Sequence, residues 1–140
     1  MIKQLSWAVI AVFICWSVLD FIIHGVLLDS VYRETASLWR PEDEMKMGLM
    51  SLVTFVISVC FVYLYSYLIE PKSLATGINF GVIFGIISGV SMGFGSYTYM
   101  PISFSLALSW FFGAFIEMTV AGVIVGWLIK TPSDGLGTAS

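Results

Sequence analysis

Charged residues are scarce in this sequence. Only 11% of its 140 residues are charged, against about 25% in ordinary soluble domains. Hydrophobic residues make up 59%, and the mean hydropathy is +0.96. The chain therefore has too little polar surface to be solvated as a globule, which excludes a soluble domain.

Histidine and cysteine are also scarce. A single histidine excludes a bis-histidine haem within one chain and any multi-histidine di-iron site. The two cysteines, Cys15 and Cys60, lie in separate apolar runs and form neither a CxxC motif nor a disulfide framework. No P-loop, HExxH, GxSxG or Cys/His nucleophile pattern occurs. We therefore expect no enzymatic activity and no cofactor.

Basic residues are few and form no patch. The chain has 6 Lys and Arg against 9 Asp and Glu, which gives a net charge of −3. Nucleic-acid binding normally requires a basic surface. We expect no nucleic-acid partner.

Most of the sequence consists of four long apolar runs, at residues 5–28, 45–69, 74–96 and 103–129. Each exceeds the roughly 20 residues that an α-helix needs to cross a bilayer, and none alternates as barrel strands do. The sequence predicts an all-α membrane protein with a four-helix transmembrane bundle and a glycine-rich third helix. Residues 1–130 would form this single domain, and the polar tail, residues 131–140, would be flexible.

An even number of spans places both termini on one side of the membrane. Lys and Arg divide three against three between the sides, so the positive-inside rule does not decide the orientation. The free amino terminus and the short first tail favour cytoplasmic termini.

The segment at residues 29–44 is the long connection of the chain. Val31, Thr35 and Leu38 share one helical face, which fits a short helix on the membrane surface. Pro41 followed by three acidic residues is typical of a helix start. These signals predict that the second membrane helix begins near residue 41.

Aromatic residues gather near the ends of the runs, as an interfacial belt requires. The group near the loop end is Tyr32, Trp39, Tyr97, Tyr99 and Trp110. The group near the termini is Trp7, Tyr63, Tyr65, Tyr67 and Trp127.

Glycine recurs at every fourth position of the third run, at Gly77, Gly81, Gly85, Gly89 and Gly93. In lipid, small residues allow helix backbones to approach closely. The fourth run carries a matching series of small residues: Ser105, Ser109, Gly113, Ala121, Gly122 and Gly126. The two runs would pack within one chain, or the stripe would bind a second copy or another membrane subunit. A glycine-lined conduit is a third interpretation.

Three ionisable residues fall within the runs: Asp20, His24 and Glu117. Such residues at membrane depth are functional candidates. Asp20 and His24 are four residues apart and share a helix face with Ser17. Glu117 lies on the small-residue face at a similar depth, so a polar cluster between the first and fourth helices is expected. It would form a proton or cation path, a packing network in which Asp20 pairs with His24, or a ligand site.

Methionines accumulate near the end at which His24 lies: Met45, Met47, Met50, Met92 and Met100. Thioethers with an imidazole suit Cu(I), but methionine also fills gaps in apolar packing. We assign no metal site and keep His24, Met45, Met47 and Met50 as copper candidates.

Three stretches carry a resemblance: DFIIHG at 20–25, the LWRP at 38–41 with Tyr32 before it and Met45 after it, and WFFGAFIEMTVAGVIVG at 110–126. Together they resemble a family of small bacterial membrane proteins known as a domain of unknown function. The resemblance implies four spans and a bacterial inner membrane, and it implies no activity.

These patterns favour a non-enzymatic integral membrane protein that acts through helix–helix contacts. It would be an accessory subunit of a membrane complex or a homo-oligomer, surrounded by membrane lipids. The alternative is a small oligomeric proton- or ion-coupled transporter or channel that uses Asp20, His24 and Glu117.

Overall fold

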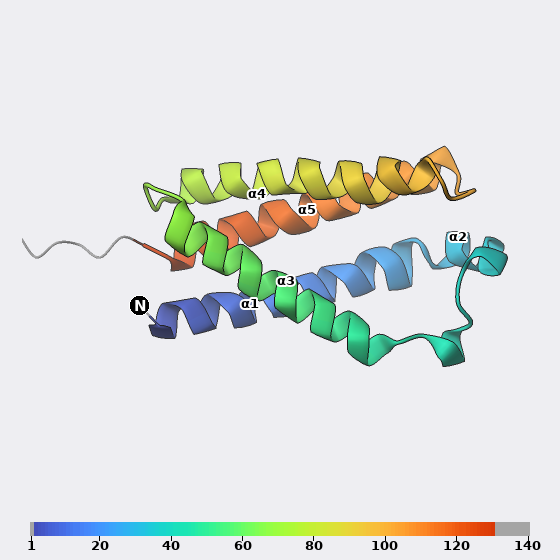
Figure 1. Ribbon diagram of the computed structural model, residues 1–140, viewed down its shortest axis with the longest axis horizontal. Helices are drawn as coiled ribbons and strands as arrows, with labels where there is room; N and C mark the ends of the chain where they lie inside the picture. The colour runs from blue at the N-terminus through green and yellow to red at the C-terminus, as the bar shows by residue number, and fades with distance from the viewer. Residues whose placement is uncertain (1, 131–140) are drawn as a thin grey trace, which may run out of the picture.

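The computed structural model describes residues 2–130, which fold into helices joined by short connections (Figure 1). The long helices are α1 (Ile2–Asp20) with its π-helical continuation η1 (Phe21–Leu27), α3 (Met47–Leu68), α4 (Leu74–Gly89) with the π-helical η4 (Val90–Gly95), and α5 (Phe104–Leu128). No strand occurs among the described residues. The predicted all-α fold with four spans is confirmed, while the expected flexible tail lies outside the described residues.

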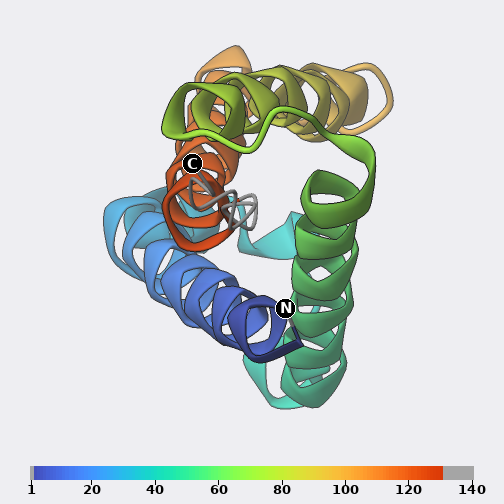
Figure 2. The same cartoon turned by 90° about the vertical axis from the view of Figure 1, so that its left-hand side faces the viewer.

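The four long helices run alternately up and down (Figure 1), so the start of α1 and the end of α5 lie at the same end of the bundle. Figure 2, seen from this end, shows the helices around a four-sided outline. All four are long and apolar enough to cross a membrane. Large apolar side chains such as Phe21, Ile83 and Trp127 point outward and are exposed. A bilayer is the natural solvent for such a surface, which fits an integral membrane protein.

Serine residues start the two helices of the second half. Ser73 accepts a hydrogen bond from the backbone N–H of Thr76 at the start of α4, over 3.0 Å. Ser103 does the same for Leu106 at the start of α5, over 3.2 Å. Side-chain caps of this kind satisfy backbone donors that a helix leaves open at its first turn.

The predicted start of the second membrane helix near residue 41 is wrong. Pro41 and the acidic residues begin only a single 3-10 turn, η3 (Glu42–Glu44), after which Met45 is extended. α3 begins at Met47. Capping and helix-dipole signals contribute only small energies, and the continuous helix starts where the apolar run starts.

Two short helices of the long connection, α2 (Asp29–Glu34) and η2 (Ala36–Leu38), cap the far end of the bundle. Val31 and Leu38 pack against a cluster that includes Leu28, Leu106 and Trp110. The connection is therefore anchored by apolar contacts and holds its aromatic residues in fixed places.

The glycine stripe of α4 and η4 faces α5 of the same chain. A Cβ atom added at Gly77 would lie 2.4 Å from the Gly122 carbonyl oxygen, and one at Gly81 would lie 2.4 Å from that of Met118. Gly85, Gly89 and Gly93 meet α5 in the same way, and Gly126 meets the backbone of α4. The contact is the most extensive between any two described elements, and the close approach depends on the missing side chains.

Gly113 does not belong to this contact, although the sequence series placed it there. A Cβ atom on Gly113 would meet the side chain of Ile23, 3.3 Å away, so this residue faces η1. The indole of Trp16 donates to the Glu117 carbonyl oxygen over 2.8 Å on the same side of α5. One face of α5 therefore packs on α4 and another on the first helix.

An apolar cluster fills the half of the bundle that holds the termini. It contains buried residues of all four long helices: Ala8, Val12, Trp16, Phe61, Val62, Tyr65, Phe80, Ala121, Val125 and Ile129. Tyr65 was expected in an interfacial belt, but it is fully buried and donates from its hydroxyl to the Ser73 carbonyl oxygen over 3.0 Å. This terminal cluster closes the bundle between Glu117 and the termini.

Candidate functional site

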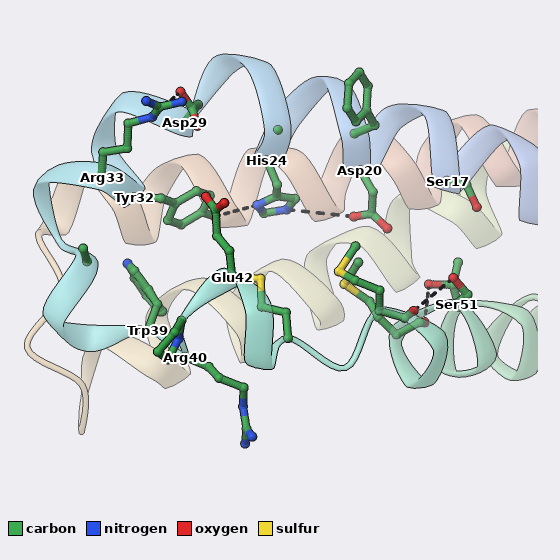
Figure 3. A pocket seen from close by; sticks show the side chains of 18 of the residues that line it. Ser17, Asp20, His24, Asp29, Tyr32, Arg33, Trp39, Arg40, Glu42 and Ser51 are labelled. Atoms are coloured by element: carbon green, nitrogen blue, oxygen red, sulfur yellow. Dashed lines mark hydrogen bonds and ion pairs between the residues drawn. The ribbon is translucent and has the colours of Figure 1, made fainter.

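A cavity of about 970 Å³ opens at the end of the bundle opposite the termini. It lies between the first helix, the long connection and the start of α3, with Trp110 contributed by α5 (Figure 3). Its lining consists of Ser17, Asp20, Phe21, His24, Gly25, Asp29, Tyr32, Arg33, Ala36, Trp39, Arg40, Pro41, Glu42, Met45, Met47, Met50, Ser51, Thr54 and Trp110. The lining of the cavity thus combines polar groups with aromatic and methionine side chains.

The Tyr32 hydroxyl connects two ring systems within this cavity. Trp110 Nε1 donates to it over 2.7 Å, and His24 Nδ1 lies 2.6 Å from it. An indole N–H only donates, so the hydroxyl accepts from Trp110 and keeps its own proton to donate. We assign that proton to the contact with Nδ1, which places the proton of the neutral His24 ring on Nε2.

The other ring nitrogen of His24 faces Asp20 (Figure 3). Nε2 lies 3.9 Å from Asp20 Oδ1, beyond the range of a direct N–H···O hydrogen bond. The two side chains are nevertheless close enough for an ion pair when the imidazole is protonated, which agrees with the pairing expected from their spacing of four residues.

Glu117 is the next ionisable group beyond Asp20. It lies on α5 and is not among the residues that line the cavity. Its Oε1 atom is buried and has no hydrogen-bond partner among residues 2–130. The structure places Asp20 and His24 side by side, and the clustering of both with Glu117 stays a prediction. Ser17 lines the cavity, but its hydroxyl bonds to the Phe13 carbonyl oxygen over 2.8 Å.

Three aromatic side chains hold one another in place beside His24. The ring centroids of Tyr32 and Trp39 are 5.5 Å apart, and those of Trp39 and Trp110 are 5.9 Å apart. Trp39 Nε1 also donates to Thr35 Oγ1 over 2.9 Å. We call Tyr32, Trp39 and Trp110 the aromatic wall of the cavity.

Tyr32 lies on α2, outside the spans. Burial raises the pKa of its phenol above the usual 10.0; the hydrogen bond from Trp110 opposes this shift, and the charge of Asp20 adds to it. Tyr32 therefore remains protonated, and a donor to His24, at physiological pH.

The sequence did not assign the aromatic wall to the site. Tyr32, Trp39 and Trp110 were placed in an interfacial belt on the basis of their position near a span end alone. A second, chemical signal was available: a buried Tyr hydroxyl or Trp N–H needs a hydrogen-bond partner, and His24 is a polar partner at this end.

The methionine cluster is only partly assembled. Met45, Met47 and Met50 line the cavity with His24, and each is exposed. Met92 and Met100 are not among the lining residues. In the described part of the chain, no group of three or more His, Cys, Asp and Glu residues is arranged to hold a metal ion.

No family model, no curated protein and no solved structure matches this chain.

Proposed function

We propose that this integral membrane protein is a small proton-coupled transporter in which Asp20, His24 and Glu117 carry the coupling. One observation supports the proposal most directly. The cavity reaches Asp20 and His24 on the first helix, and Glu117 on the neighbouring α5 has a buried oxygen without a partner among the described residues.

The energetic argument concerns Glu117. Burying a polar group without a hydrogen bond costs roughly 2–7 kcal/mol. If Glu117 served only in packing, an apolar side chain of similar size could take its place without a loss of stability. Ionisable groups that remain at membrane depth commonly mark proton and ion routes.

The residues have distinct roles in this proposal. His24 stands at the cavity side with its Nε2 proton toward Asp20, and we propose that Asp20 links the cavity to Glu117. Two neighbouring carboxylates repel each other. A proton or a cation at this pair relieves that repulsion, so the arrival of one is coupled to the departure of the other.

The cavity lies at the end of the bundle opposite the termini, and we propose that the protein works by alternating access and not as an open pore. The terminal cluster, which includes Trp16, Phe61 and Val125, separates Glu117 from the opposite end. Transporters with a central site commonly open it to one side at a time. Because one chain of four spans encloses little space, we propose that the transporter is a homo-oligomer.

A second candidate is an accessory subunit that works through helix packing. The first half of α3 supports it, because this half carries a continuous exposed apolar surface: Met47, Leu49, Met50, Leu52, Val53, Phe55, Val56 and Ile57. Another membrane helix or lipid would cover it. For both candidates we propose a non-enzymatic protein of the bacterial cytoplasmic membrane with cytoplasmic termini.

Proton flux into proteoliposomes tests the leading candidate. A pH gradient across vesicles that contain a pH-sensitive dye should collapse faster with the wild-type protein than in empty vesicles. Glu117→Gln should abolish this acceleration, while the exposed carboxylate variant Glu34→Gln, outside the cavity lining, should retain it. Equal flux from all three proteins, or none from the wild type, would reject the proposal.

A further inference from the structure

The charges around the cavity are not balanced inside it. Arg33 is neutralised by Asp29 through a 2.9 Å ion pair. Arg40 is exposed, and its guanidinium group points away from the cavity (Figure 3). Glu42 points into the cavity, and Asp20 lies at its deep side (Figure 3). Arg33 and Arg40 therefore place no unpaired positive charge in the cavity, whereas Asp20 and Glu42 place negative charge in it.

The neutral groups of the cavity suit a cation with apolar substituents. Trp39 is a partly exposed member of the aromatic wall, and a cation within about 6 Å of its ring centroid would be attracted by the π electrons. Met45, Met47 and Met50 supply polarizable, adaptable surface on the opposite side. An anion would meet the carboxylates of Asp20 and Glu42 here, whereas Arg33 is already paired with Asp29.

We propose that the cavity binds lipophilic organic cations, with the positive centre beside the Asp20 carboxylate and the apolar groups against the aromatic and methionine side chains of the lining. This inference rests on the proposed transport function and names its substrate class. The size of about 970 Å³ is within the range of small-molecule sites.

A pair of isosteric ions tests the charge preference. Binding of radiolabelled tetraphenylphosphonium and of tetraphenylborate is measured by equilibrium dialysis on the purified full chain in detergent, with empty micelles as background. Saturable binding of the cation, and none of the borate, is expected. Equal binding of both ions, or of neither, would overturn the inference.

Variants locate the site and separate the two proposals. Asp20→Asn should weaken tetraphenylphosphonium binding at least about tenfold. Trp39→Leu should also weaken it, and Trp39→Phe, which keeps an aromatic ring, should bind more tightly than Trp39→Leu. The control Glu34→Gln should bind as the wild type does. Unchanged binding in Asp20→Asn and Trp39→Leu would overturn the inference. Cation binding without proton flux would remove the transport function alone, and proton flux without cation binding would remove only the substrate class.

Discussion

His24 is the residue at which the polar groups of the cavity meet. Tyr32 fixes its Nδ1 as an acceptor, so Nε2 presents a proton to Asp20 across 3.9 Å. Neither neighbour alone would orient the ring. The Tyr32 hydroxyl is in turn fixed by Trp110, which comes from 78 residues farther along the chain.

At this scale we predict that Tyr32 titrates at a higher pH than a free tyrosine side chain, because burial raises its pKa above 10.0. A folded-state pKa above the unfolded one means that the stability contributed by the neutral phenol is present below about pH 10 and is lost as pH rises through the raised value.

Carbon-13 NMR of labelled tyrosine rings measures this titration, and Tyr32→Phe assigns the signal. The Tyr32 resonance should shift at a higher pH than that of a free tyrosine derivative in the same detergent. Titration at or below the pH of the free derivative would show that the Tyr32 hydroxyl is solvated and would contradict its hydrogen bonds to Trp110 and His24.

At the scale of elements, α4 and α5 form the rigid half of the bundle. Their backbones touch at Gly77, Gly81, Gly122 and Gly126. The stripe is therefore occupied within the chain, and further contacts to a partner would have to use other surfaces, of which the exposed face of α3 is one.

Gly81→Ala should destabilise the protein by about 1–3 kcal/mol, because its Cβ atom would lie 2.4 Å from the Met118 carbonyl oxygen and force the helices apart. Gly48→Ala is the matched control: it lies in α3, has nothing within 4 Å of its Cβ position, and should be neutral or stabilise by up to about 1 kcal/mol. Unfolding in mixed detergent micelles measures both. Equal stability of the two variants would contradict the observed packing.

The elements were largely predictable, because hydropathy and spacing are local properties of the chain. The four spans and the glycine stripe follow from runs and a period of four. The start of α3 at Met47 was missed because weak local capping signals at Pro41 were given too much weight. The role of Tyr32 and the orientation of Gly113 depend on which helix lies opposite, and no local spacing contains that information.

At the scale of the whole molecule, the bundle has a closed end and an open one. The terminal cluster closes the first, and the cavity occupies the second. This difference between the two ends suits a site that is reached from one side of a membrane, with the buried Glu117 nearer the middle of the bundle than the site.

The up-and-down arrangement predicts the sidedness of the chain. In a background without Cys15 and Cys60, Lys130→Cys and Lys3→Cys should react with a membrane-impermeant maleimide from one side. Glu34→Cys should react only from the other side. All three positions are exposed. Labelling of Lys130→Cys and Glu34→Cys from the same side would contradict four spans.

The central claim is that Asp20 and Glu117 carry charge in response to protons, and solid-supported-membrane electrophysiology tests it most directly. A rapid pH step applied to adsorbed proteoliposomes should produce a transient current with the wild type and Glu34→Gln, and none with Asp20→Asn or Glu117→Gln. A current of unchanged size in both carboxyl variants, with folding intact, would contradict the account.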